Sequence, residues 1–230
     1  DLVRTWQEDQ NPYDLLAQGL RDRGIATGRV GLEENVRFVF ADGIARSAPG
    51  LHLQSATPVT AGCRMVKSEH EIALMRLASE VTLAAYEATW KALKIGMTGS
   101  EITALSRQAH EALGFEGAAD LVLIGAASSF PHGSVKPTRL EEGTIVLFDG
   151  GCNVAGYKSD ISRTFVIGKP TDKMRRVFET VKSAQSAALA AARPGVTCGA
   201  IDAAARTVID QAGFGPDRSE EHTSELQSLR

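Results

Sequence analysis

Two stretches of the chain resemble each other at a fixed spacing. Residues 96–98 (Gly-Met-Thr) precede one expected helix, and residues 113–115 (Leu-Gly-Phe) follow it. Residues 195–197 (Gly-Val-Thr) and 212–214 (Ala-Gly-Phe) frame a second expected helix in the same way, shifted by 99 positions at both ends, from 96 to 195 and from 114 to 213. The equal shift at both ends argues against a chance similarity of two helix boundaries. The fold should therefore contain two similar halves.

The second half of this repeat is expected to be incomplete. Each copy has a long helix, then a short helix, and then strands. His132 lies in the strand region of the first copy, and its counterpart would fall at position 231, beyond the last residue of the chain. A sheet built from two such halves would then lack part of its second half.

The N-terminal region, residues 1–66, reads as a small mixed α/β domain. The hydrophobic pattern predicts alternating short helices and strands there. The expected helices are 12–20 and 35–45, and the expected strands are 29–32 and 51–56. The chain begins with Asp1 rather than Met, so we expect a native start to be missing, with a removed signal peptide as an open alternative.

The rest of the chain predicts an α+β arrangement of helices and strands. Two capping boxes, beginning at Ser68 and Thr98, predict a long helix to about residue 93 and a shorter one to residue 113. Apolar runs then predict strands, and Gly-rich stretches between them predict turns, including one at 150–153. The expected strands are 121–124, 144–148, 155–160 and 161–167, followed by helices at 172–193 and 199–212.

The amino-acid composition indicates which class of protein this chain belongs to and which classes are excluded. Hydrophobic residues make up 43% and charged residues 23%, with a net charge of −3, as in an ordinary globular protein. No basic stripe is present, so nucleic acid is not an expected partner. No apolar run is long enough for a membrane helix. The three cysteines, an odd number without a CxxC pair, favour reduced thiols and a cytoplasmic location.

Two aspartates carry the strongest local signal for chemistry. Asp149 ends one expected strand, Asp160 ends the next, and a Gly-rich turn separates them. If the hairpin is symmetric about Val154 and Ala155, the two carboxylates lie nearly opposite, with Cβ atoms about 5 Å apart. Oxygen ligands at this spacing favour Mn²⁺ or Mg²⁺, with Co²⁺ and Zn²⁺ as further choices. From spacing alone, the favoured interpretation is instead that Asp149 is a turn residue and Asp160 a solvated or capping residue.

The histidines give a weaker signal. His132, in a Pro-His-Gly sequence, is a candidate by position, although a loop histidine is more often a surface or packing residue. His70 and His110 each precede a glutamate on an expected helix, but Leu74 and Gly114 stand where a zinc-peptidase motif needs its second histidine. We therefore interpret His70 and His110 as solvated residues on helix faces. Nucleophile-elbow, P-loop and dinucleotide-binding motifs are absent from the sequence.

Three segments resemble the M24 metallopeptidases, a family that includes Xaa-Pro aminopeptidase, prolidase and methionine aminopeptidase. Residues 148–165 (Phe-Asp-Gly-Gly through Ser-Asp-Ile-Ser-Arg-Thr-Phe) are similar to the metal-binding hairpin of that family. Residues 130–133 (Phe-Pro-His-Gly) resemble its substrate-side histidine strand, and residues 66–75 resemble its entry helix. The resemblance implies a pita-bread fold, incomplete here, that follows part of a creatinase/prolidase-type N-terminal domain.

The resemblance also implies a domain division and a site. Residues 1–66 would be the partial N-terminal domain, 67–217 the truncated catalytic domain, and 218–230 a foreign or disordered tail. Asp149 and Asp160 would hold two divalent metal ions, most consistently Mn²⁺, and His132 would contact a peptide substrate. The family supplies a further histidine and two glutamates, which this chain lacks.

The activity implied is removal of the N-terminal residue from peptides, at Xaa-Pro bonds, by a full-length homodimer. The fragment itself is expected to be inactive. Two alternatives are a metal-free, creatinase-like amidinohydrolase of the same fold and a non-catalytic pita-bread binding module. The pair Asp149 and Asp160 argues against both, because neither needs metal ligands.

Overall fold

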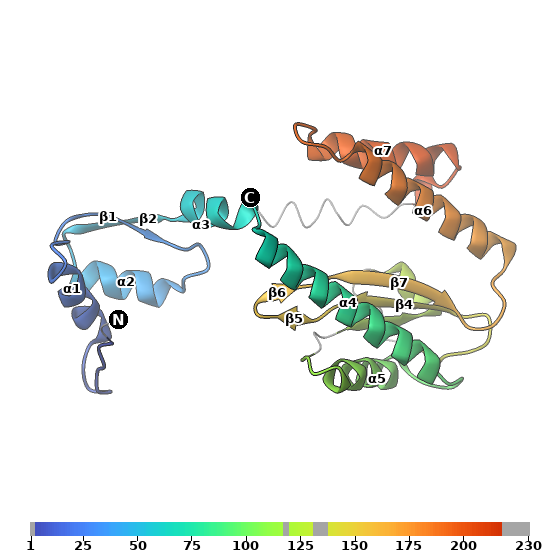
Figure 1. The fold of residues 1–230 in the computed structure, drawn as a ribbon, viewed down its shortest axis with the longest axis horizontal. Coiled ribbons are helices and arrows are strands. Elements are labelled where there is room, and N and C mark those ends of the chain that lie inside the picture. The colour runs from blue at the N-terminus through green and yellow to red at the C-terminus, as the bar shows by residue number, and fades with distance from the viewer. Residues whose placement is uncertain (1–2, 117–119, 131–137, 218–230) are drawn as a thin grey trace. The chain divides into compact units, whose positions relative to one another are not determined.

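The computed structural model describes residues 3–116, 120–130 and 138–217, and it divides into two compact units, Asp1–Ile72 and Ala73–Arg230 (Figure 1). His132 and the tail 218–230 lie outside the described residues. In the part of the chain that is described, the search for a helix long and apolar enough to cross a membrane finds none.

The first unit pairs two parallel strands with three helices. Its elements are α1 (Pro12–Arg21), β1 (Gly28–Leu32), α2 (Phe38–Ser47), β2 (Leu51–Ser55) and α3 (Thr57–Met65). The side chain of Asn11 caps α1, and Ala17, Ala48 and Leu51 form a small core. The four expected elements are present. Helix α3 was not predicted from the sequence, although Pro58 in its first turn is a common helix-start signal.

The second unit contains the two helices that the capping boxes predict, except for the first turn of the longer one. They are α4 (Glu69–Ala92) and α5 (Gly99–Ala112). At the start of α4 the Ser68 amide donates to the Glu71 carboxylate over 2.6 Å, and the Thr98 amide does the same to Glu101 over 2.8 Å at the start of α5. Both side chains satisfy amides that a helix leaves unpaired at its first turn, so both predicted starts are confirmed.

An antiparallel sheet in the order β3-β4-β7 forms the centre of this unit. Its strands are β3 (Leu121–Ile124), β4 (Ile145–Gly150) and β7 (Ile161–Val166), and a short 3₁₀ helix, η1 (Gly125–Ser129), follows β3. A two-stranded hairpin of β5 (Asn153–Val154) and β6 (Tyr157–Lys158) continues from β4 and β7. The expected single strand 155–160 is wrong, because the turn of the hairpin lies at Ala155 and Gly156, both with positive φ.

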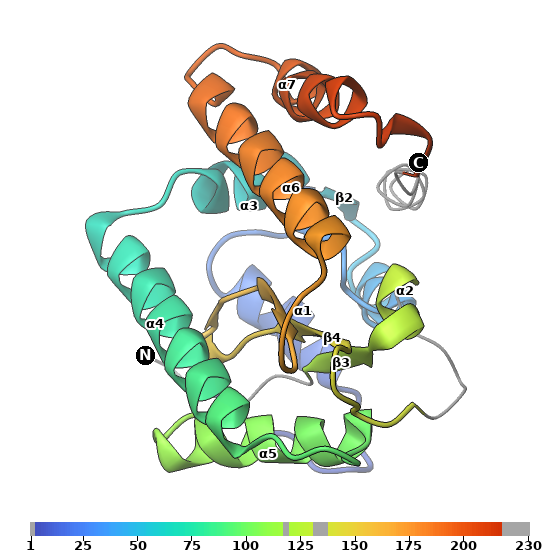
Figure 2. The ribbon, with the colours of Figure 1, turned by 90° about the vertical axis from the view of Figure 1, so that its right-hand side faces the viewer.

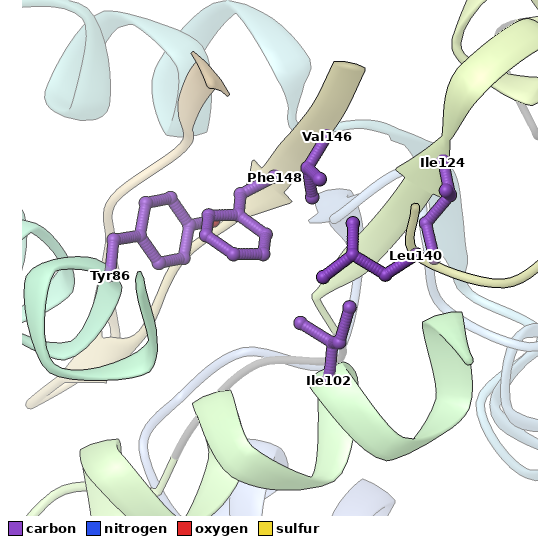
Figure 3. Close-up of a cluster of buried hydrophobic side chains, with 6 residues drawn as sticks. All are labelled: Tyr86, Ile102, Ile124, Leu140, Val146 and Phe148. Carbon is purple, nitrogen blue, oxygen red and sulfur yellow. The ribbon is translucent and has the colours of Figure 1, made fainter. Parts of the chain in front are cut away.

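One face of the sheet is covered and the other is open. Val146 and Phe148 point from β4 into a core where they meet Tyr86 of α4 and Ile102 of α5 (Figure 3). Both helices therefore lie against the same face of the sheet (Figure 2). Because side chains alternate along a strand, Asp149 falls on the opposite, open face. The core therefore packs against one face of β4, and the Asp149 side chain lies on the other face.

The second copy of the repeat is present as helices. These are α6 (Asp172–Ala191) and α7 (Cys198–Gln211), which pack against each other, followed by η2 (Gly215–Asp217). Both ends of α7 lie 99 positions after those of α5, and α6 ends 99 positions after α4. Among the described residues, α6 buries only Ala184 and α7 buries none, and no strand follows α7 up to residue 217. The repeat was therefore placed correctly from sequence.

Candidate metal site

Asp149 is held at the end of β4 by the neighbouring strand. It pairs with Ser162 of β7, and the Ser162 hydroxyl donates to its Oδ1 over 2.6 Å. The Asp149 side chain is half-buried. This bond fixes one carboxylate oxygen and leaves the other with free lone pairs, as a metal ligand requires.

Asp160 lies directly before β7 and is exposed to solvent. The hairpin is not symmetric about Val154 and Ala155, as the expectation of nearly opposite carboxylates required, because it turns at Ala155 and Gly156 and the register moves by two residues. Asp149 faces Ser162 instead. Since Asp160 and Ser162 are two residues apart, extending the alternation of β7 by one residue predicts that Asp160 lies on the same face as Asp149, diagonally. Diagonal neighbours lie about 7–8 Å apart, close enough for two carboxylates to share a pair of cations.

Two glycines between the aspartates allow the backbones to approach closely. A Cβ at Gly151 would overlap the Ser159 carbonyl oxygen and lie 2.6 Å from its hydroxyl oxygen. A Cβ at Gly150 would overlap the carboxylate of Asp120. The prediction of a turn at 150–153 is therefore wrong. The glycines are required by close packing, and the strand ladder continues past them through the bond from the Ser159 amide to the Cys152 carbonyl, at 3.1 Å.

A buried polar network that was not predicted from the sequence lies behind Asp149. The carboxylate of Asp120 accepts hydrogen bonds from the Tyr86 hydroxyl, at 3.3 Å, and from the Ser106 hydroxyl. His110 is fully buried beside it, and its Nδ1 lies 2.9 Å from the Ser106 carbonyl. The interpretation of His110 as a solvated residue is therefore wrong. Its spacing of four from Ser106 and eight from Ile102 could have placed it on the buried face of α5.

The phenol of Tyr86 is strongly perturbed. Burial, and then the negative charge and hydrogen bond of Asp120, raise the pKa of Tyr86 far above its ordinary value of 10.0. The charges of Asp149 and Asp160 act in the same direction, so both lie within electrostatic reach of this phenol.

This raised pKa predicts a loss of stability at alkaline pH. In the unfolded chain Tyr86 ionises near pH 10, whereas the folded protein keeps the proton. The stabilisation is therefore complete below about pH 10 and is lost as the pH rises towards the folded pKa. We expect the free energy of unfolding of Tyr86→Phe to fall less than that of the wild type between about pH 8 and about pH 11. Denaturant unfolding at a series of pH values measures this, and equal pH slopes for the two proteins would refute it.

Among the described residues, Asp149 and Asp160 are two candidate ligands, and they do not form a complete metal site. A search among them for three or more grouped His, Cys, Asp or Glu side chains finds no group. His132 cannot be placed, because it lies outside the described residues. The donor chemistry of Asp149 and Asp160 nevertheless fits a hard divalent cation, since both offer carboxylate oxygens on one open face. A cation there would also relieve the repulsion between them.

A groove lies on the same open face. It has a volume of about 800 Å³ and is lined by Ile145, Thr164 and Val166 of the sheet and by apolar residues of α6, including Val177 and Val181. Ile145 and Asp149 stand at opposite ends of β4 on this face. The open face therefore carries the Asp149 carboxylate near one end of β4 and the apolar groove at the other end.

Comparison with known proteins shows which family and fold this chain resembles. Residues 73–224 match the model of Metallopeptidase family M24. An Xaa-Pro dipeptidase of Pyrococcus horikoshii is 30% identical over 188 residues, covering 81% of this chain and 54% of that protein. The crystal structure of X-Pro aminopeptidase from Thermotoga maritima MSB8 superposes with a TM-score of 0.83 at 30% identity, covering 91% of this chain and 60% of that one.

A dipeptidase structure from Pyrococcus horikoshii OT3 gives a similar result, with a TM-score of 0.84 at 28% identity over 93% of this chain and 60% of that one. The chain thus spans about 60% of the length of such relatives. The α+β architecture is that of the pita-bread fold, with part of the fold missing. On the family match, the fold and the sequence likeness together, the chain belongs to the M24 metallopeptidase family.

Proposed function

We propose that this chain is part of a metal-dependent peptidase that removes the N-terminal residue of peptides at Xaa-Pro bonds. The observation that supports the proposal is that Asp149 pairs with Ser162 near the end of β4, while Asp160 directly precedes β7, where strand alternation predicts a side chain on the same face. Membership of the M24 family and the likeness to an Xaa-Pro dipeptidase and an X-Pro aminopeptidase support the reaction and the substrate class.

The residues of this chain would have distinct roles. Asp149, fixed by Ser162, and Asp160 would hold two divalent cations, with Mn²⁺ as the proposed metal. Such cations supply an activated water and polarise the peptide carbonyl. His132 would contact the substrate and assist proton transfer or charge stabilisation. With two ligands from this chain, the fragment alone would not hydrolyse peptides.

Two further proposals concern the whole protein. A cytoplasmic location is supported by the free thiols of Cys63, Cys152 and Cys198. A homodimer is proposed for the full-length protein from the family resemblance alone.

The test is hydrolysis of an Xaa-Pro dipeptide, with Mn²⁺ and with a chelator. It compares the 230-residue chain with a polypeptide extended to the length of the relatives. We expect the longer polypeptide to cleave the dipeptide only with metal, and the shorter chain to be inactive. An Xaa-Leu dipeptide of the same first residue is the control for proline specificity. Failure of the longer polypeptide with Mn²⁺, Co²⁺ and Zn²⁺ would refute the peptidase proposal.

A further inference from the structure

Two buried polar side chains of α4 reach towards the strands that carry the aspartates. Thr82 and Tyr86 are four residues apart on α4 and are 0% and 1% exposed. Residues at this spacing lie on the same side of a helix, about 5–6 Å apart. Each contacts a residue next to one of the two proposed ligands, so a single rigid helix touches both arms of the site.

The Thr82 contact leads to Asp160. The Thr82 hydroxyl donates to the Ala78 carbonyl over 3.0 Å, and its oxygen lies 2.8 Å from the Ser159 hydroxyl. Since Thr82 has one proton, we assign the Ser159 hydroxyl as the donor in the second bond. The Ser159 oxygen in turn accepts the Cys152 amide over 3.0 Å, and the Cys152 thiol donates to the Ala78 carbonyl over 3.3 Å. The residue before Asp160 is thus tied to one turn of α4.

The Tyr86 contact leads to Asp149. The Tyr86 ring packs on Phe148 with 5.2 Å between ring centroids, and its hydroxyl donates to Asp120. The carboxylate of Asp120 is in turn packed against the backbone of Gly150. The residues on both sides of Asp149 are therefore held, one directly and one through Asp120.

We propose that Thr82 and Tyr86 are positioning residues that set the separation of Asp149 and Asp160. The inference rests on the proposed metal-binding function. Groups that orient metal ligands, without contacting the metal, commonly change metal affinity by about 10- to 100-fold when they are removed. Here the segment of α4 from Ala78 to Tyr86 contacts both strands and so fixes their positions relative to each other.

Thr89 provides a matched control for Thr82. It lies on the same helix, is 1% exposed, and its hydroxyl donates to the Ala85 carbonyl over 2.7 Å. Within the described part of the chain, that helix bond is the one recorded for its side chain. Thr82→Val and Thr89→Val therefore both remove a buried hydroxyl and a bond within the helix, but only Thr82→Val removes a bond to the hairpin.

The experiment uses the 230-residue chain and two measurements. The first, without metal, is amide hydrogen exchange at Cys152 and Ser159. The second is Mn²⁺ titration followed by broadening of the amide signals of residues 149–160. We expect Thr82→Val to exchange about tenfold faster at these amides and to bind Mn²⁺ about tenfold more weakly. Thr89→Val should match the wild type in both, and Thr82→Ser should restore both. Tyr86→Phe should weaken Mn²⁺ binding without changing exchange at Cys152.

The outcomes separate this inference from the proposed function. Equal Mn²⁺ affinity and equal exchange for Thr82→Val and Thr89→Val would overturn the positioning role. If Thr82→Val does not fold, Ser159→Ala, which removes the other partner of the same bond, decides by the same two measurements. If the wild type binds no Mn²⁺ while Thr82→Val still accelerates exchange, the same titration on the polypeptide extended to the length of the relatives decides. No Mn²⁺ binding there would refute the metal proposal and leave Thr82 as a purely structural anchor.

Discussion

Replacing Phe148 by alanine should lower the free energy of unfolding of the second unit by about 3–5 kcal/mol. The Phe148 side chain is fully buried between α4 and the sheet and contacts the rings of Tyr86 and Phe165, with centroids 5.2 and 5.4 Å away. Its removal leaves a cavity that neighbouring rings on a helix and a strand cannot easily fill. Chemical denaturation, followed by circular dichroism, measures the change.

Phe178→Ala is the control for this prediction. Phe178 lies on α6 in the same unit but is 50% exposed. Its replacement should change the free energy of unfolding by less than about 1 kcal/mol. Equal losses for Phe148→Ala and Phe178→Ala would mean that the core between α4, α5 and β4 does not stabilise this unit as described.

A methyl group at position 151 should be as damaging as the loss of a buried ring. In Gly151→Ala the new Cβ would overlap the Ser159 carbonyl oxygen, which belongs to the backbone of the opposite strand and cannot rotate away. The strands must separate, and the bonds between Cys152 and Ser159 lengthen. We expect a loss of about 3 kcal/mol in the free energy of unfolding, at the upper end of the usual cost of overpacking. Thermal and denaturant unfolding measure it.

Gly199→Ala is the control, and it should change the free energy of unfolding in the opposite direction. Gly199 lies in the first turn of α7, and a Cβ there meets nothing within 4 Å. Alanine restricts the unfolded chain, so stability should rise by about 0.4–1 kcal/mol. A Gly151→Ala variant as stable as the wild type would show that the hairpin strands are farther apart than described.

Local signals and the repeat predicted much of the fold. The capping boxes at Ser68 and Thr98 predicted both helix starts. This was possible because the capping residue and the glutamate that accepts a hydrogen bond from its free amide stand a constant three residues apart in the sequence. The 99-residue shift predicted where α7 begins and ends from the bounds of α5. These features depend on residues close in sequence or on an internal repeat at a constant spacing, so contacts between distant segments were not needed to predict them.

Other features depend on contacts between distant segments. The turn at Ala155 was missed because a residue with positive φ other than glycine or asparagine is rarely the first choice, and this moved the register of Asp149 by two. Asp120 was not singled out from the sequence, since its partners Tyr86 and Ser106 come from two different helices. Burial of His110 was visible only from its shared face with Ile102.

The central claim is that Asp149 and Asp160 bind a divalent cation together. Mn²⁺ titration of the wild type, Asp149→Asn, Asp160→Asn and the double variant tests it, with the exposed Asp172→Asn as the control. We predict that Mn²⁺ broadens the amide signals of residues 149–162 in the wild type and in Asp172→Asn, and that either single replacement in the pair abolishes most of the effect. Binding that survives in the double variant, or broadening centred elsewhere, would contradict the account.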